Sequence, residues 1–154
     1  MRAVLTRVSS ADVRIDDRIV GSIGRGFLIL LGVGPGDTPQ VCRKLAEKIC
    51  GLRIFTDEND KMNLGLSDVG GSILVVSQFT LFGDCKKGRR PSFSGAALPE
   101  TAVPLYEQFL RECEALGFPP AHGSFGADMK VTSVNDGPVT LILDTEAWWP
   151  GGKL

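Results

Sequence analysis

The stretch Gly26-Phe27-Leu28-Ile29-Leu30-Leu31-Gly32-Val33 is a continuous apolar run bounded by glycines. Strands that are buried on both faces read as unbroken runs of this kind, whereas half-exposed strands alternate between apolar and polar residues. We therefore predict a central strand here. Residues 72–82 begin with a similar apolar run and predict a second buried strand.

Further strands are predicted on both sides of this pair. Val4 to Val13 is rich in β-branched residues, Asp16-Asp17 marks a turn, and Arg18 to Ile23 returns as a strand. Two more strands, at about residues 126–134 and 139–143, are joined by a predicted tight turn at residues 135–138. Strands therefore dominate the chain.

Two helices are predicted between the strands. Thr38 caps the first and Pro39 suits its first turn, and apolar residues recur at helical spacing at Val41, Leu45, Ile49 and Leu52. Pro99 begins the second, whose apolar stripe is Val103, Tyr106, Phe109, Leu110 and Cys113. Residues 57–71 predict a loop with a short hairpin, and residues 83–99 a long loop. The pattern indicates one sheet-dominated α/β domain with two covering helices, rather than a doubly wound parallel sheet.

Composition and charge exclude several classes of protein. The 154 residues are 43% hydrophobic and 23% charged, as in an ordinary single globular domain. Lys and Arg number 17 against 18 acidic residues, so any nucleic-acid contact must come from a local patch. No apolar run is long enough to span a bilayer, and residues 1–4 lack the layout of a signal peptide. We expect a soluble, cytoplasmic protein that has no contact with a membrane.

Metal and nucleotide chemistry find little support. The four cysteines are widely spaced and only one histidine accompanies them, which is a poor ligand set for zinc, so we expect reduced thiols, no metal and no cofactor. The chain has no phosphate-binding loop of the nucleotidase type. Residues 32–36 lie where a dinucleotide fingerprint would stand, but Asp37 occupies the position of its third glycine and Pro35 lacks an N–H group. A plain turn between strand and helix is the simpler interpretation.

Nucleophilic catalysis by a serine also lacks its usual partners. There is no G-x-S-x-G elbow, and His122, the only imidazole, stands in a predicted loop. A basic stretch in the long loop contains Lys86, Lys87, Arg89 and Arg90. Such a run is either a solvated loop or a grip for phosphate groups. Phe125 and Met129 are either core residues or apolar contacts for a base or ligand.

Two motifs are more specific. Ser77-Gln78-Phe79-Thr80-Leu81 places polar residues at the end of an apolar strand, where they need hydrogen-bond partners or a function. Asn135-Asp136-Gly137-Pro138-Val139-Thr140 contains a Gly-Pro step, a natural place for a cis peptide bond or for an ordinary turn.

Together these motifs resemble the signatures of the D-aminoacyl-tRNA deacylase family, namely a Ser-Gln-Phe-Thr-Leu segment and an Asn-x-Gly-Pro-Val-Thr segment. Residues 1–4, 21–26, 88–93 and 123–129 also look like the family. The resemblance covers about residues 1–144, which we take as the deacylase domain, and leaves residues 145–154 with Trp148-Trp149 as a C-terminal tail. It implies the family's barrel-like fold of mixed and antiparallel strands.

The resemblance also implies a function. It is hydrolysis of the ester that joins a D-amino acid, or wrongly attached glycine, to the acceptor end of tRNA. The family forms homodimers with active sites at the interface, where Gly137-Pro138 of one subunit would enter the other's pocket as a cis peptide and exclude L-amino acids. Main-chain carbonyl groups suit such steric exclusion because substitutions of side chains do not alter them.

From this resemblance we expect the following site. The catalytic segment would be Ser77, Gln78, Phe79 and Thr80, with chiral selection by Gly137 and Pro138. Substrate or tRNA would be held by Arg7, Lys86, Lys87, Arg89, Arg90, Phe125, Met129 and Asn135, with Arg7 bracing the Gly-Pro loop. Main-chain N–H groups around Phe79 and Thr80 are candidates for an oxyanion hole, and the 2′-OH of tRNA for activating water. A noncatalytic module that binds the RNA acceptor end, and a small-molecule esterase using Ser77, remain alternatives.

Overall fold

Strand β3 (Gly26–Gly32) is the predicted apolar run, and it lies inside a six-stranded sheet. The structure, a computed structural model, describes residues 1–154. β3 pairs in antiparallel fashion with the first half of β1 (Arg2–Ile15) and in parallel with β6 (Ser72–Ser77). The predicted pair of buried strands is thus confirmed as neighbours in one mixed sheet.

β1 organises the rest of the sheet. Its second half pairs with β2 (Arg18–Ile23), on the edge where its first half meets β3. Its opposite edge pairs with β8 (Lys130–Asp144) over almost its whole length. The short β7 (Ala121–His122) extends the sheet beyond β6.

The sheet curls until its two ends nearly meet. β2 lies against β7 so closely that a Cβ atom added to Gly21 would stand 2.8 Å from the carbonyl oxygen of His122. Glycine at this position therefore permits the approach of the two strands. The result is the nearly closed, barrel-like sheet that the family resemblance implied.

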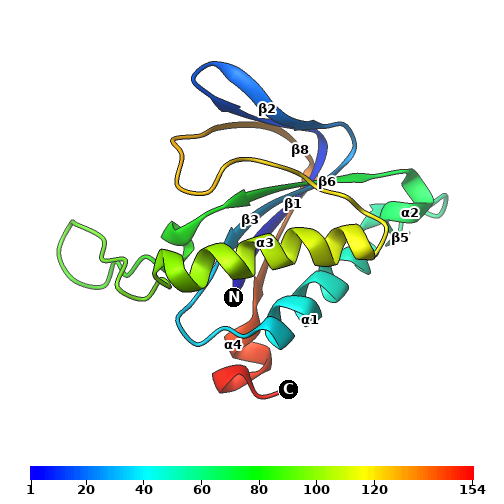
Figure 1. The fold of residues 1–154 in the computed structure, drawn as a ribbon. Coiled ribbons are helices and arrows are strands. Elements are labelled where there is room, and N and C mark those ends of the chain that lie inside the picture. The colour runs from blue at the N-terminus through cyan, green and yellow to red at the C-terminus, as the bar shows by residue number, and fades with distance from the viewer.

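Two helices, α1 (Pro39–Cys50) and α3 (Pro99–Ala115), cover one face of this sheet (Figure 1). Thr38 caps α1 as predicted, because its hydroxyl accepts a hydrogen bond from Val41 N at 3.3 Å. A core of 24 buried residues fills the space between helices and sheet. A second cluster of 7 buried residues lies on the other face of β3 and β6 and includes Val8, Leu28, Leu74 and Val76.

The predicted strand over residues 72–82 is wrong in its second half. β6 ends at Ser77, and residues Phe79–Phe82 form the 3-10 helix η1. At Gln78 the backbone departs from the strand (φ −144°, ψ 79°). The apolar residues Phe79, Leu81 and Phe82 therefore lie on a helical turn and not on the strand. Alternating apolar residues do not distinguish a strand from a tight helix over so few positions.

The prediction that a turn at residues 135–138 separates two strands is also wrong. β8 continues through it, with Thr140 opposite Thr6 and Asn135 opposite Val8 on β1. Between these two pairs β1 advances by two residues and β8 by five. The additional residues of β8 therefore bulge out of the sheet. The first predicted strand also begins later than expected, at Lys130 rather than near residue 126.

Smaller elements complete the chain. The predicted hairpin is formed by β4 (Phe55–Thr56) and β5 (Met62–Leu64), and the one-turn helix α2 (Leu66–Val69) follows it without having been predicted. The tail forms α4 (Thr145–Trp148) and η2 (Pro150–Gly152). None of the helices has the length and apolar character that crossing a membrane requires.

Candidate active site

The candidate site begins where β6 gives way to η1. Ser77 is the last residue of β6 and lies opposite Leu31 on β3. The N–H of Gln78 donates to Leu31 O at 2.8 Å, which fixes the point of departure from the sheet. Beyond it the chain turns into η1 and exposes Phe79, whose side chain is 56% accessible. The polar segment predicted from the sequence therefore lies at the carboxyl end of β6, where the chain leaves the sheet.

A cavity of about 270 Å³ opens beside this segment. One wall is the end of β6 with the start of η1, and the other is the chain leading into β8. Its lining residues are Val76, Ser77, Gln78, Phe79, Phe125, Gly126, Ala127, Asp128, Met129 and Val131. The structure thus brings together Ser77, Gln78 and Phe79 with Phe125 and Met129, residues almost fifty positions apart in the sequence.

Phe79, the first residue of η1, lines this cavity, whereas Thr80, which was predicted for the catalytic segment, is not among the lining residues. Within η1 the N–H of Leu81 donates to Gln78 O at 3.3 Å, and that of Gly83 to Thr80 O at 2.9 Å. The N–H groups of Phe79 and Thr80 precede this pattern and have no acceptor inside the helix. The side-chain amide of Gln78 donates to the hydroxyl of Thr80, so the Thr80 side chain is joined to a residue of the cavity wall.

No imidazole stands among the residues that line the cavity. The Nδ1 atom of His122 lies 2.6 Å from the carbonyl oxygen of Gly123. What the arrangement can do chemically is hold a small, partly apolar group next to main-chain N–H donors and hydroxyl groups. That suits a reaction in which negative charge develops on an oxygen.

Tyr106 of α3 supports the cavity from behind, a role that the sequence analysis missed because the residue belongs to an ordinary apolar helix stripe. Its hydroxyl donates to Val75 O at 3.2 Å, and its ring centroid lies 5.9 Å from that of Phe125. Burial raises the pKa of the Tyr106 phenol to about 12, so the hydroxyl keeps its proton and remains a donor at neutral pH.

The basic loop, residues 83–99, lies at the same end of β6. It follows η1 and is closed at its base by two main-chain hydrogen bonds between Asp84 and Ser92, of 2.7 and 2.9 Å. Phe93 packs edge-on against Phe79, with 5.2 Å between ring centroids. The loop extends away from the sheet, at the left of Figure 1. Its four cations are all exposed: Lys86, Lys87, Arg89 and Arg90.

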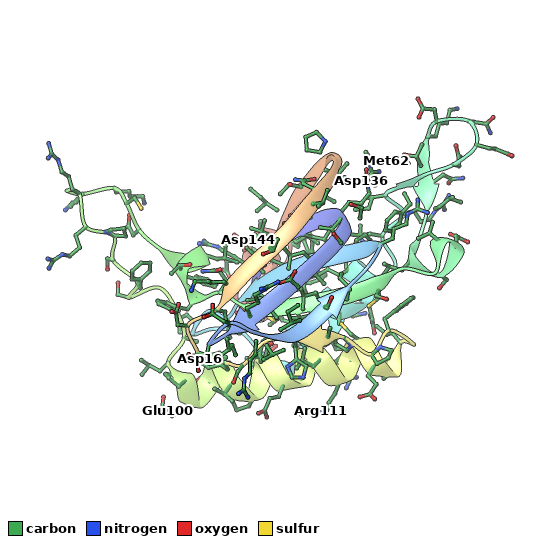
Figure 2. The ribbon with its side chains drawn as sticks, turned by 90° about the horizontal axis from the view of Figure 1, so that it is seen from above. Asp16, Met62, Glu100, Arg111, Asp136 and Asp144 are labelled. Atoms are coloured by element: carbon green, nitrogen blue, oxygen red, sulfur yellow. The ribbon has the colours of Figure 1, made fainter.

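The Gly137-Pro138 bulge does not line this cavity. Val131 does, but the bulge lies six residues farther along β8, and Figure 2 shows Asp136 at the rim of the molecule. The Gly137-Pro138 peptide bond is cis, and both residues are exposed.

Arg7 and Asn135 make contacts within and behind the bulge, and for Arg7 this is the bracing of the Gly-Pro loop that the family resemblance implied. Arg7 is only 8% exposed, and its guanidinium donates to Asp136 O at 2.8 Å and to Ile54 O at 2.7 Å. Asn135 donates to the hydroxyl of Thr140 at 2.9 Å and accepts from Val139 N at 2.9 Å. These contacts place Arg7 and Asn135 as supports of the bulge.

Comparison with known proteins agrees with the sequence resemblance. Residues 4–144 match the family described as D-Tyr-tRNA(Tyr) deacylase. A D-aminoacyl-tRNA deacylase of Desulforudis audaxviator is 60% identical over 145 residues, which cover 94% of this chain and 97% of that protein. Another, from Desulfatibacillum aliphaticivorans, is 58% identical over 146 residues, covering 95% of this chain and all of that protein (100%).

Two solved structures have similar folds. One is described as a c-Myc DNA unwinding element binding protein, with a TM-score of 0.87, 39% identity, and coverage of 94% of this chain and 98% of that one. The other is a probable eukaryotic D-amino acid tRNA deacylase, with a TM-score of 0.80 over 92% of this chain and 97% of that one. At 19% identity, the second supports the fold alone.

Proposed function

The chain belongs to the D-Tyr-tRNA(Tyr) deacylase family and is thus an ester hydrolase, and from this premise we propose that it deacylates D-aminoacyl-tRNA in the cavity beside η1. Water would add to the ester carbonyl, and the bond to the ribose oxygen of the terminal adenosine would break, releasing tRNA and a D-amino acid. The observation on which this rests most directly is the cavity lined by Ser77, Gln78 and Phe79. It adjoins the first turn of η1, where the N–H groups of Phe79 and Thr80 have no acceptor inside the helix.

Those N–H groups are proposed as the oxyanion hole. An aminoacyl ester is already activated, so its hydrolysis requires stabilisation of the tetrahedral oxyanion and a positioned water more than a strong nucleophile. Main-chain donors fixed by a folded segment supply the first requirement without reorganisation. The 2′-OH of the terminal ribose is proposed to orient or activate the water.

Ser77 is not proposed as a nucleophile. A serine hydroxyl needs an adjacent base to become reactive. Neither an imidazole nor a lysine lines the cavity, and the one carboxylate that does, Asp128, forms no hydrogen bond with Ser77. Gln78, tied to the hydroxyl of Thr80, is proposed to orient the ester or the adenosine. Phe125 and Met129 offer the apolar surface against which a base or an amino-acid side chain can pack.

The basic loop is proposed to hold the tRNA backbone. Four exposed cations in five residues can bind phosphate groups although the whole chain has a formal net charge of −1. The Phe93–Phe79 contact joins this loop to the cavity wall, so phosphate binding and ester placement occur at one edge of the molecule.

Chiral selection is proposed to come from a second copy of the chain. In a homodimer, the carbonyl groups of Gly137 and its neighbours would enter the partner's cavity and occupy the space of an L side chain. The bulge is exposed and distant from its own cavity along β8, and β8 has one unpaired edge with accessible apolar residues, Val134 at 54% and Ile142 at 79%. These features support an interface along this strand. A site that excludes L side chains by shape must accept glycine, so glycyl-tRNA is also a proposed substrate.

A second candidate function is binding of nucleic acid without hydrolysis. It is favoured by one observation, the structural relative described as a DNA unwinding element binding protein. The basic loop and the cavity would then only hold a strand end. A small-molecule esterase that uses Ser77 is a third candidate.

One assay separates the candidates. The purified protein is incubated with D-tyrosyl-tRNA, L-tyrosyl-tRNA and glycyl-tRNA, and loss of the ester is followed over time. The proposal expects hydrolysis of the D- and glycyl esters and persistence of the L-ester. Binding without ester loss would favour the second candidate, and equal loss from D- and L-esters would contradict chiral selection.

A further inference from the structure

The far end of η1 is held by a residue that the sequence analysis did not single out. The guanidinium of Arg2 donates from Nη1 to Leu81 O at 3.1 Å and lies 4.6 Å from the ring centroid of Phe82. Its Nε atom pairs with Asp144 Oδ2 at 3.0 Å. One side chain therefore connects the beginning of β1, the end of β8 and η1.

The floor beneath η1 is made of glycine backbone. A Cβ atom added to Gly32 would stand 2.9 Å from Gln78 O and 3.1 Å from the Phe82 ring. One added to Gly34 would stand 3.0 Å from the same ring. The Gly32–Gly36 segment, which the sequence analysis weighed as a nucleotide-binding turn, thus has another explanation: it lets η1 rest directly on the end of β3.

A four-residue 3-10 helix cannot fix its own position, because its hydrogen bonds are few and poorly aligned. Its placement must come from contacts with the rest of the fold. At the front, Phe79 packs on the basic loop, and at the rear, the Phe82 ring lies between the glycine floor and Arg2. Main-chain donors stabilise an oxyanion only when they are held within about 0.5 Å of the productive geometry.

We infer that Arg2, anchored by Asp144, is a positioning residue that sets the placement of the Phe79 and Thr80 N–H groups through the rear of η1. The inference rests on the proposed function of those groups as an oxyanion hole. Arginine suits the task because its planar fork donates in two directions at once while its face packs on an aromatic ring. Lysine can reach only one of the two acceptors at a time.

Arg2 is also suitable for a test because it is not a core residue. Its side chain is 41% accessible, so its replacement removes contacts of η1 without leaving a cavity in the core. Arg43 of α1 provides a matched control, since its Nε also pairs with a carboxylate, Glu112 Oε1, at 3.5 Å and it is exposed. This Arg43–Glu112 ion pair involves no residue of η1 or of the cavity wall.

The experiment compares Arg2→Met, Arg2→Lys, Gly34→Ala and Arg43→Ala with the unaltered protein. Measured quantities are kcat and KM for D-tyrosyl-tRNA and the melting temperature. Arg2→Met is expected to lower kcat by about 10- to 100-fold, the cost of a displacement of roughly 1 Å. The KM of Arg2→Met should change less than about twofold. The kcat of Arg2→Lys should lie between those of Arg2→Met and the unaltered protein, and Arg43→Ala should have the kcat and KM of the unaltered protein.

Gly34→Ala displaces the Phe82 ring from below and leaves Arg2 intact, so it should lower kcat in the same selective way. It keeps the inference testable if Arg2→Met lowers the melting temperature below that of the assay. Unchanged kcat in a folded Arg2→Met or Gly34→Ala protein would overturn the inference, as would a rise in KM with kcat preserved. If the unaltered protein fails to hydrolyse D-tyrosyl-tRNA, the proposed function fails instead, which distinguishes the two failures.

Discussion

Single residues of the candidate site differ in what they offer to catalysis. Ser77 and Thr80 have hydroxyl groups, but the Thr80 hydroxyl accepts a hydrogen bond from Gln78 and neither residue has an imidazole or a lysine beside it along the cavity. Phe79 offers a main-chain N–H without a partner in its helix. At this scale the proposal assigns the rate enhancement to the backbone rather than to a reactive side chain.

Ser77→Ala is therefore expected to retain most of the deacylase activity, with kcat for D-tyrosyl-tRNA within about tenfold of the unaltered protein, because a lost hydrogen bond costs on the order of 1 kcal/mol. Single-turnover ester loss measures this. Mass spectrometric detection of an aminoacyl adduct on Ser77 or Thr80 would contradict the main-chain mechanism.

Phe79→Pro tests the donor itself. Proline removes the N–H, and it is tolerated at the first position of a helix, which Phe79 occupies directly after the cap residue Gln78. Loss of one oxyanion donor should lower kcat by about 10²- to 10³-fold. Phe79→Ala is the matched control: it removes the same ring but keeps the N–H, so it should lose far less activity. Equal losses in both variants would assign the effect to the ring.

Among the elements, the loop after η1 has the clearest separable role. It is closed at its base by the Asp84–Ser92 bridge and its four cations are exposed, so its charges can change without disturbing the sheet. η1 and this loop are adjacent in sequence, yet one is proposed to serve catalysis and the other binding. Their effects should therefore separate in kinetic measurements.

Replacing the cations Lys86, Lys87, Arg89 and Arg90 by Ala should weaken tRNA binding and flatten its salt dependence. Each phosphate contact contributes about 0.7 to 0.9 to the slope of log K against log salt, so the slope should fall by roughly 3 if all four bind. Filter binding from low to moderate salt measures it, with the ratio of D- to L-ester hydrolysis expected to stay constant. Arg43 and Lys44 of α1, changed together to Ala, serve as the charge control. An unaltered slope in the loop variant would remove the loop from the binding site.

For the whole molecule the question is whether one chain forms a complete site. The cavity includes β8 only at Val131, near the start of the strand, whereas the Gly137-Pro138 bulge lies farther along β8 and is exposed. Arg7 and Asn135 hold the bulge in shape from within the chain. A rigid projection on one chain and an open cavity on another are complementary features in a symmetric pair.

Mixing two variants with different defects, one inactive and the other unselective, tests the shared site. One carries Phe79→Pro, and the other lacks Gly137 and Pro138, which shortens the bulge and should impair discrimination against L-tyrosyl-tRNA. After denaturation and refolding together, a mixed dimer has one intact cavity facing one intact bulge. Selective D-ester hydrolysis should reappear, up to about half of the normal rate per mixed dimer. Each variant refolded alone is the control, and absence of recovery in mixed dimers would place the whole site in one chain.

The sequence by itself determined the sheet-dominated fold class, the strands β1 to β3 and both long helices. It also singled out five of the residues that line the cavity: Ser77, Gln78, Phe79, Phe125 and Met129. It could do so because burial leaves a local record: unbroken apolar runs for β3, a helical stripe for α3, and a cap and proline at the start of α1. The polar Ser77-Gln78 step after an apolar strand was likewise visible as a local exception.

Only the tertiary structure decided where β6 stops and how the Gly-Pro segment is presented. Phe79 to Phe82 form η1 because the Phe82 ring rests on Gly32 and Gly34 and Arg2 holds Leu81 O. These contacts join residues 48 to 79 positions apart. The bulge in β8 exists because β1 continues to pair with β8 on both sides of it. Neither outcome is encoded in the local pattern, because each depends on what the neighbouring strand does.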